Sequence, residues 1–252
     1  MTKRMLIGVL AVALALIGTG CDSKVALESP SVAAEVADGG GTLHLTWAEV
    51  TNATSYEIKA GDSTYTTTGT SFDVSNPAAT IEVRAVSGNS KSDSAVVICG
   101  VVESTIDVYG DLDITRPSGF GFAENGQADT CAIVPQNFPR LDFYADGKTV
   151  AGEMRLVGAG KLNAGRKGNG IKAGAASYED SKLADSPGAY SDPLTVVADG
   201  TYYLRISADT TGTWSIGENY AKVKVVSILA ESLKVTLKLS YQKRPGFRWL
   251  AN

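Results

Sequence analysis

The chain has 252 residues, enough for one or two domains of ordinary size that can each bury a core. Its 27 acidic residues outnumber its 23 lysines and arginines, and the formal net charge of −4 weighs against a nucleic-acid partner, which calls for a basic surface. The single histidine also argues against a histidine-rich zinc site.

The first stretch of the chain has the composition of a secretory signal. Lys3 and Arg4 precede an apolar run over residues 5–17, and the small residues 18–20 come just before Cys21. A run of about 13 residues would extend roughly 20 Å as a helix, which is too short to cross a bilayer. We therefore expect this stretch to be removed.

The small residues before Cys21 resemble a bacterial lipobox, although Gly18 stands where that motif usually has leucine. The resemblance implies a lipoprotein signal peptide over residues 1–20, a lipid-bearing Cys21 and a tether over residues 21–29. It also implies an exported protein held on a bacterial membrane by lipid, on the periplasmic or cell-surface side, with the choice between inner and outer membrane left open. The alternative is an ordinary cleaved signal, with Cys21 free or paired.

Short segments of alternating polarity follow the tether. They are residues 42–47, 56–59 and 80–86. In the first of them Leu43, Leu45 and Trp47 share one face and His44 points the other way, which is the period of a half-buried strand. The inward residues expected in the third are Ile81, Val83 and Ala85. The run Thr64–Thr68 is expected to be an exposed strand, with a contact surface as the alternative. Short strands separated by Gly, Asn and Asp predict an antiparallel sandwich.

Several features of residues 30–98 are shared with one domain family. Pro30 opens the first strand, Trp47 has the place of a core tryptophan, Ala53–Tyr56 is similar to the entry to strand C, and Ile81–Ala85 is similar to strand F. In these features the segment resembles a fibronectin type III domain. The resemblance implies an Ig-like sandwich that serves as a spacer or protein-interaction module and does not catalyse a reaction.

Residues 99–252 continue the β pattern with three predicted hairpins. Asp146-Gly147 and Asp199-Gly200 are dipeptides favoured in two-residue hairpin turns because they tolerate positive φ. The strongest hairpin pairs residues 220–225 with residues 235–242, since apolar and polar residues alternate in both. The sequence therefore predicts an all-β chain, in which an N-terminal Ig-like sandwich is followed by a second antiparallel, sandwich-like domain of unknown function.

The pattern of this last hairpin is similar to the C-terminal hairpin of the haem-binding, HmuY-like secreted lipoproteins. That family can hold haem between two axial histidines or methionines. Beyond the leader, His44 and Met154 are the only such residues in this chain, and they belong to different predicted domains. The resemblance therefore implies a topology without haem, and we expect no cofactor.

Residues 158–187 are rich in Gly, Ala, Lys and Ser and are expected to form a long loop, either functional or mobile. Cations in this loop could bind an anionic glycan or the acidic face of a partner, and a solvated loop is the alternative. The candidate ligand contacts are Lys161, Arg166, Lys167, Lys172 and, further along, Trp214. Gly158–Lys161 has a superficial likeness to a phosphate loop, but Leu162 stands where Ser or Thr would hold magnesium.

Two cysteines remain if Cys21 carries lipid. In an oxidising compartment Cys99 and Cys131 could form a disulfide, which would stabilise the fold by roughly 3–4 kcal/mol in the chain-entropy model. Two buried free thiols are the alternative.

Three further groups could form sites or have purely structural roles. Asp107, Asp111 and Asp113 could offer oxygen ligands to calcium, but they lack the glycine and terminal glutamate of an EF-hand loop. Turn capping is the preferred interpretation, and no metal is expected. His44 is expected to be an exposed strand residue and not a catalytic base. A set of aromatic residues could build a sugar-stacking platform or fill a core: Tyr190, Tyr202, Tyr203, Trp214, Tyr220 and Trp249.

These observations favour a membrane-anchored, noncatalytic protein that displays its second domain to an envelope or extracellular protein or glycan. The alternative from another class is a carbohydrate hydrolase that uses only Asp and Glu, which should show two converging carboxyl groups and a raised pKa on one of them. A structural subunit of an envelope assembly is the third interpretation.

Overall fold

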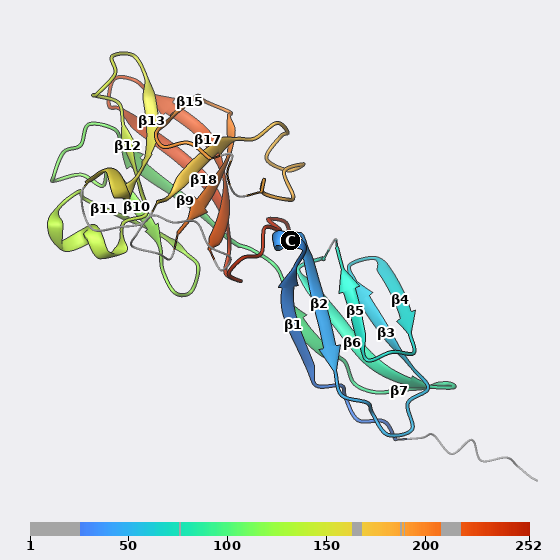
Figure 1. Ribbon diagram of the computed structural model, residues 1–252. Coiled ribbons are helices and arrows are strands. Elements are labelled where there is room, and N and C mark those ends of the chain that lie inside the picture. The colour runs from blue at the N-terminus through green and yellow to red at the C-terminus, as the bar shows by residue number, and fades with distance from the viewer. Residues whose placement is uncertain (1–25, 76, 163–167, 187, 189, 208–217) are drawn as a thin grey trace, which may run out of the picture.

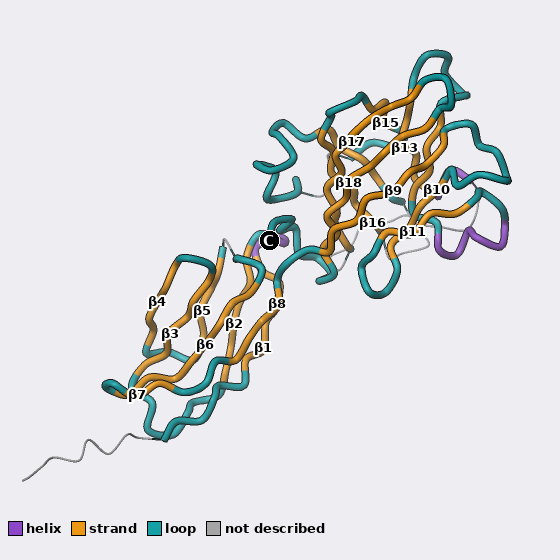
Figure 2. Tube along the Cα trace, turned by 180° about the vertical axis from the view of Figure 1, so that it is seen from behind, coloured by secondary structure: helices purple, strands orange, loops and turns teal. Residues whose placement is uncertain are grey.

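The computed structural model describes residues 26–75, 77–162, 168–186, 188, 190–207 and 218–252. They form two bodies built from β-strands that lie end to end (Figure 1), and the view from behind shows the same arrangement (Figure 2). The helices in this part of the chain are short 3-10 turns, and none has the length and apolar character needed to cross a membrane. The prediction of an all-β chain is confirmed.

The first body is a sandwich of two antiparallel sheets. One sheet has the order β1 (Val32–Ala37), β2 (Thr42–Trp47), β5 (Ser71–Val74). The other has the order β4 (Ser63–Thr67), β3 (Ser55–Ala60), β6 (Thr80–Ser87), β7 (Ser90–Lys91), and β8 (Ala95–Ile98) also pairs with β6. A 3-10 turn, η1 (Asp38–Gly40), joins β1 to β2.

The core of this sandwich contains the residues that the alternation predicted. Those with no exposed surface include Leu43, Leu45, Ile58, Ile81, Val83 and Ala85. Trp47 packs on Tyr56 with ring centroids 5.2 Å apart, and the Tyr56 hydroxyl accepts a hydrogen bond from the Val50 amide at 2.8 Å. Burial of the alternate residues follows from the two-residue period of a strand, which turns every second side chain toward the opposite sheet.

The polar faces of the first sandwich are also as expected. His44 lies on the outer face of β2, where its Nδ1 is 2.5 Å from Oδ1 of Asp73 on β5. β4 is an exposed strand, and Tyr65 on it packs against Phe72 with ring centroids 5.1 Å apart. The predictions of an exposed strand at Thr64–Thr68 and of an exposed strand histidine are confirmed for the described positions.

The second body is a sandwich of two five-stranded antiparallel sheets. One has the order β11 (Ala128–Cys131), β10 (Gly119–Phe122), β12 (Phe143–Asp146), β13 (Met154–Gly158), β15 (Leu194–Val196). The other has the order β14 (Gly170–Ala173), β16 (Thr201–Ile206), β17 (Asn219–Leu229), β18 (Lys234–Gln242), β9 (Val102–Tyr109). A 3-10 turn, η2 (Pro135–Arg140), connects β11 to β12.

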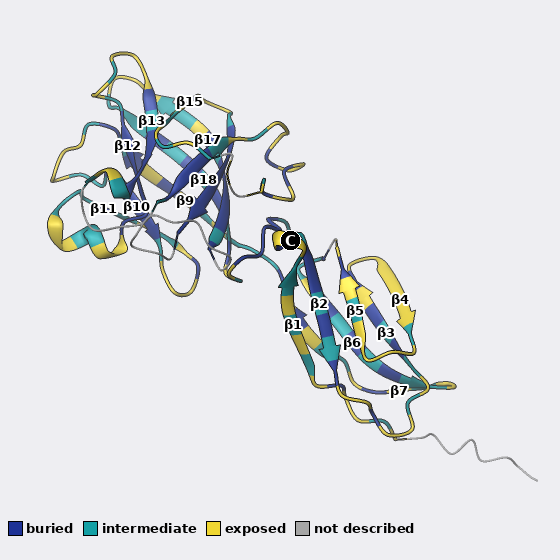
Figure 3. Cartoon of the chain, in the orientation of Figure 1, coloured by how far each residue is buried: buried dark blue, intermediate teal, exposed yellow. Residues whose placement is uncertain are grey.

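The last predicted hairpin is confirmed as the centre of the second sheet. β17 and β18 pair in register, with Val223 opposite Leu239 and Val225 opposite Leu237, and all four side chains are fully buried. These apolar faces meet the other sheet in one core (Figure 3), whose largest members include Phe120, Phe143, Leu156 and Leu204.

The turn predicted at Asp146-Gly147 is longer than two residues. β12 ends at Asp146 and β13 begins at Met154, so the hairpin is antiparallel as expected but closes through residues 147–153. The side chain of Asp146 explains the difference, because its Oδ1 accepts hydrogen bonds from the amides of Lys148 and Thr149 at 3.0 and 2.9 Å. Burial alone would raise the pKa of Asp146, but the hydrogen bonds from Thr149, Arg155 and Lys148 outweigh it and hold the pKa at about 2.

The prediction of a hairpin at Asp199-Gly200 is wrong. Asp199 has the positive φ of 60° expected in such a turn, but β15 before it and β16 after it belong to opposite sheets. The Asp199 amide donates to the Val225 carbonyl at 2.7 Å, which directs the chain across the edge of the sandwich to pair with β17. A turn-forming dipeptide fixes the local bend, whereas the sheet that the next strand joins depends on distant residues.

The expected loop over residues 158–187 is partly regular. It contains the 3-10 turn η3 (Ala159–Leu162) and the edge strand β14, whose Ile171 is fully buried and pairs with Leu204. The low periodicity of this segment hid a strand of four residues, which is too short to give a clear alternation.

The two sandwiches are joined by the last ten residues, which we call the C-terminal strap (residues 243–252). Figure 1 shows this dark red segment at the junction. Phe247 and Trp249 belong to the core of the first sandwich, whereas Leu250 packs against Tyr203 and Tyr220 of the second. The predicted second domain, residues 99–252, thus also contributes side chains to the core of the first sandwich.

Arg248 connects both bodies through several hydrogen bonds. Its amide and Nε donate to the carbonyls of Gly40 and Gly39 in η1, at 2.9 and 2.8 Å, and its Nη1 donates to the Ala184 carbonyl at 2.6 Å. Gly40 has a φ of +100°, and a Cβ at this position would lie 2.3 Å from the Gly246 carbonyl oxygen. A glycine is therefore required at the point where the strap meets the first sandwich.

The disulfide expected between Cys99 and Cys131 is not formed. Both are buried free thiols: Cys99 lies in the core of the first sandwich, and Cys131 lies in a small cluster of the second with Leu141 and Ala159. The spacing of the cysteines in the sequence does not show that they belong to different sandwiches. The alternative interpretation, two buried free thiols, is the correct one.

Both thiols should resist alkylation at neutral pH in the folded protein and react after unfolding. Burial raises the pKa of Cys99 to about 11 and also raises the pKa of Cys131, so the reactive thiolate is scarce at either residue. Mass spectrometry of iodoacetamide-treated peptides, with and without denaturant, measures this. A Cys99–Cys131 cross-linked peptide in protein isolated with its thiols blocked would contradict it.

Candidate functional site

The candidate site lies at one end of the second sandwich, which we call the loop pole and define by Lys161, Asn169, Lys172, Asp192 and Ser207. Asn169 holds this end together from a buried position. Its Oδ1 accepts a hydrogen bond from the Ser207 amide at 2.9 Å, and its Nδ2 donates to the Asp142 carbonyl at 2.7 Å. Asn169 thus ties the residue just before β14 to the residue just after β16.

The predicted ligand contacts fall into two groups. Lys161 is exposed on η3, and Lys172 is half-buried on β14. Arg166, Lys167 and Trp214 lie outside the described residues. The Lys172 ammonium is 2.6 Å from Oδ2 of Asp185, so part of its charge is neutralised, whereas Lys161 is available to solvent.

Asp192 lies beside the end of β13. Its Oδ1 accepts a hydrogen bond from the Gly158 amide at 2.7 Å. Burial raises the pKa of Asp192, and the Gly158 hydrogen bond and the charge of Lys161 partly offset that effect. The Asp192 carboxylate thus already accepts the hydrogen bond that the Gly158 amide of a phosphate loop would donate to phosphate. Gly158–Lys161 therefore does not act as a phosphate loop.

A buried ion pair lies at the end of β16. Arg205 at the end of β16 pairs through Nε with the carboxylate of Glu218, just before β17, and the two side chains are 1% and 0% exposed. Tyr190 and Tyr220 lie next to the pair, with ring centroids 6.5 Å apart, and burial raises the pKa of both phenols. No pattern in the sequence indicated that these two charges are buried and paired.

The aromatic residues considered for a sugar platform pack inside the protein. Tyr202, Tyr203, Tyr220 and Trp249 are at most 8% exposed, and Tyr190 is half-buried. Trp214 lies outside the described residues. For the described members, core packing is the correct interpretation, because a stacking platform must present a ring face to solvent.

Tyr178 covers Lys222 and Ser240 on the outer face of the second sheet. These three residues were not singled out from the sequence. Its hydroxyl is 2.6 Å from Oγ of Ser240, its carbonyl accepts a hydrogen bond from Nζ of Lys222 at 2.8 Å, and Lys222 and Lys238 both lie over its ring. Burial lowers the pKa of Lys222. A serine near a lysine of lowered pKa could form a nucleophile and base, but Ser240 and Lys222 are 0% and 4% exposed beneath Tyr178. The arrangement therefore stabilises the sheet.

The three aspartates considered for calcium do not converge. Asp107 accepts a hydrogen bond from Thr236 at 2.6 Å and pairs with Lys234 at 2.8 Å, Asp111 pairs with Arg116, and Asp113 accepts two hydrogen bonds from Thr115 at 2.7 Å. No group of three or more potential metal ligands occurs among the residues that the structure describes. Asp113 has the turn-capping geometry that was preferred.

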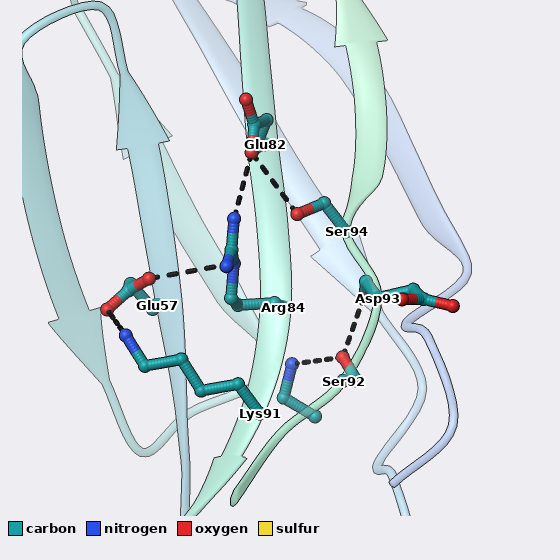
Figure 4. Close-up of polar contacts among 8 residues, drawn as sticks. Glu57, Glu82, Arg84, Lys91, Ser92, Asp93 and Ser94 are labelled. Atoms are coloured by element: carbon teal, nitrogen blue, oxygen red, sulfur yellow. Dashed lines mark hydrogen bonds and ion pairs between the residues drawn. The ribbon is translucent and has the colours of Figure 1, made fainter.

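The outer face of the first sandwich carries a chain of charges (Figure 4). Glu57 lies between Lys91, at 2.6 Å, and Arg84, at 3.6 Å, while Glu82 accepts hydrogen bonds from Arg84 at 3.0 Å and Ser94 at 3.2 Å. The two acids and two cations neutralise one another. This face therefore presents little net charge to a ligand, and exposed pairs of this kind add little stability.

Comparison with known proteins gives likeness at the level of fold only. No family model matches the chain, and no curated protein matches it. Similar solved structures include that of FN3tt mut, with 24% identity, 29% of this chain and 92% of that chain covered, and a TM-score of 0.26. A DUF4466 family protein from Parabacteroides merdae has 8% identity, 86% and 98% coverage and a TM-score of 0.40. The chitinase ChiA74 from Bacillus thuringiensis has 13% identity, 86% and 27% coverage and a TM-score of 0.24.

TM-scores of this size say nothing about activity. What the chain itself defines is an all-β protein made of two antiparallel sandwiches.

Proposed function

We propose that this is an exported protein, anchored to a bacterial membrane by lipid on Cys21, which displays its second sandwich as a noncatalytic binding domain on a spacer. The spacer is the first sandwich, and the bound partner is an envelope or extracellular protein or glycan. The leader, residues 1–20, and the lipobox-like residues before Cys21 support export and anchoring.

The placement of the two ends of the first sandwich is the observation that carries the proposal. The described chain enters this sandwich at the end far from the second sandwich (Figure 1). At the opposite end, Gly39 and Gly40 bind the C-terminal strap next to the second sandwich. If the chain is attached to a membrane before residue 26, the first sandwich would therefore separate the second sandwich from that membrane by the length of one domain.

The junction supports a stiff spacer. Arg248 binds both bodies, and Nε2 of Gln242 donates hydrogen bonds to the carbonyls of Cys99 and Trp249, both at 2.9 Å. A junction fixed by buried hydrogen bonds and by aromatic side chains in the neighbouring core resists bending better than a polar linker does.

The loop pole supports binding in preference to hydrolysis. Asp192 is the one carboxyl group of the described residues whose pKa is clearly raised, and the groups that act on it are an amide and Lys161. A glycosidase would place a second carboxylate beside the raised one. The exposed Lys161 on the same pole suits an anionic glycan or an acidic protein surface.

The anchor is tested by the intact mass of the membrane-extracted protein. We expect a mature species that begins at Cys21 and carries acyl chains, and we expect Cys21→Ser to leave the membrane fraction. A mature protein that begins at another residue would overturn the anchor.

The contact surface is tested by capture of glycans and envelope proteins with the full chain and with the variant Lys161→Gln/Arg166→Gln/Lys167→Gln. We expect this variant to lose the ligands that the unaltered protein retains. The matched control is Lys59→Gln/Lys91→Gln/Lys148→Gln, which removes three cations away from the loop pole. Equal retention by both variants would overturn the assignment of the loop pole.

A further inference from the structure

A cleft of about 750 Å³ lies between the two sandwiches, on the side of the junction formed by the strap. It falls within the size range of about 300–1,000 Å³ that small-molecule sites occupy, and such sites favour domain interfaces. Its walls come from the first sandwich, the connection between the bodies, the β10–β11 turn and the strap. The lining includes Ile98, Val101, Val102, Asn125, Lys243 and Arg244.

One side of the cleft is apolar and open to solvent. Ile98, at the end of edge strand β8, is 73% exposed, more than any other large apolar residue that the structure describes. Val101 and Val102 continue this side and are half-buried. Exposed aliphatic side chains that gather in a concave site, and are not scattered over a surface, indicate a binding surface for an apolar group.

The other side of the cleft is cationic. Lys243 and Arg244 line it, and the lining contains no aspartate or glutamate, although the chain as a whole is acidic. Nη1 of Arg244 donates to the Ala34 carbonyl at 3.1 Å, whereas its buried Nε has no hydrogen-bond partner among the described residues. Two cations on one wall, with no acid beside them in the lining, favour an anionic group supplied from outside.

We propose that this cleft binds an amphipathic organic carboxylate, that is, a small acid with an aliphatic chain. Lys243 and Arg244 hold the carboxylate, and the aliphatic chain lies on Ile98, Val101 and Val102. This site is separate from the loop pole and does not depend on the display function. The bound acid contacts the first sandwich through Ile98 and the strap through Lys243 and Arg244, so it also strengthens the junction.

Calorimetric titration of the full chain with decanoate, below the concentration at which it forms micelles, tests the site. We expect one saturable site, and we expect 1-decanol, which lacks the charge, and butyrate, which lacks the chain, to bind about tenfold or more weakly. Lys243→Gln/Arg244→Gln should weaken decanoate binding by about tenfold or more.

Two single variants keep the test independent of the contact between Arg244 and Ala34. Lys243→Gln, which alters an exposed side chain, and Ile98→Ser should each weaken binding by about threefold or more, and Lys59→Gln on the first sandwich should leave it unchanged. No saturation at about 1 mM decanoate would overturn the site. Binding of decanol as tight as that of decanoate, or full binding by both single variants, would overturn it as well.

Discussion

Replacing Phe247 with alanine should destabilise the first sandwich by about 3–5 kcal/mol, although this residue follows the whole second sandwich in the sequence. The Phe247 side chain is fully buried and packs in the same core as Leu43 and Ile81. Its loss removes apolar contacts and leaves a cavity that the sheets of the sandwich cannot fill. Amide hydrogen exchange, followed by mass spectrometry on peptides from β2 and β6, should show faster exchange in Phe247→Ala.

The control for this prediction is Leu229→Ala, at the exposed end of β17, where the side chain is 53% accessible. It should change the stability of the protein by less than about 0.5 kcal/mol. If Phe247→Ala left exchange in β2 and β6 unchanged while exchange in the second sandwich accelerated, the strap would belong energetically to the second sandwich, and its role in the first would be refuted.

Replacing Glu218 with leucine should lower the free energy of unfolding by about 3–5 kcal/mol, because it removes the carboxylate that pairs with Nε of the buried Arg205. The pair joins the end of β16 to the residue just before β17. Urea denaturation monitored by circular dichroism should show the loss as a lower transition midpoint with an unchanged slope.

Two companion variants make this measurement specific. Arg205→Met/Glu218→Leu removes both charges and should recover most of the stability, since an apolar pair of similar volume needs no counter-charge. Glu124→Leu removes an exposed carboxylate and should have little effect. A double variant no more stable than Glu218→Leu would show that side-chain packing, and not the charge left on Arg205, causes the loss.

Alternation of polarity predicted most of the strands that carry a core. Leu43, Leu45 and Ile81 in the first sandwich and Val223 and Leu239 in the second are fully buried, as the two-residue period required. The signal worked at these positions because each strand has one face on the core and one on solvent.

The signal failed where burial depends on partners far away in the sequence. Lys222 alternates with apolar neighbours, a pattern typical of a side chain that faces solvent, but it is buried beneath Tyr178. The strap has no periodicity, and its buried residues Phe247 and Trp249 are explained only by the sandwich that receives them. Cys99 and Cys131 could not be placed in separate clusters without the fold.

At the candidate site, charge and composition singled out cations, but not the polar residues around them. Lys161 and Lys172 were singled out by charge and by the loop-like composition around them. Asn169 and Asp192, whose side chains form hydrogen bonds with backbone groups at the loop pole, are ordinary polar residues in the sequence. Their roles arise from burial, which converts a side chain that would be solvated into a structural hydrogen-bond partner.

The C-terminal strap also sets an order of events during synthesis. Gly39 leaves the ribosome early, while Arg248, which binds it, is separated from it by 209 residues. The N-terminal sandwich must wait for Phe247 and Trp249 before its hydrophobic interior is closed. The domain that is translated first therefore cannot be completed until the strap has been made, and a nascent chain released early would expose an unfinished apolar surface to chaperones and proteases.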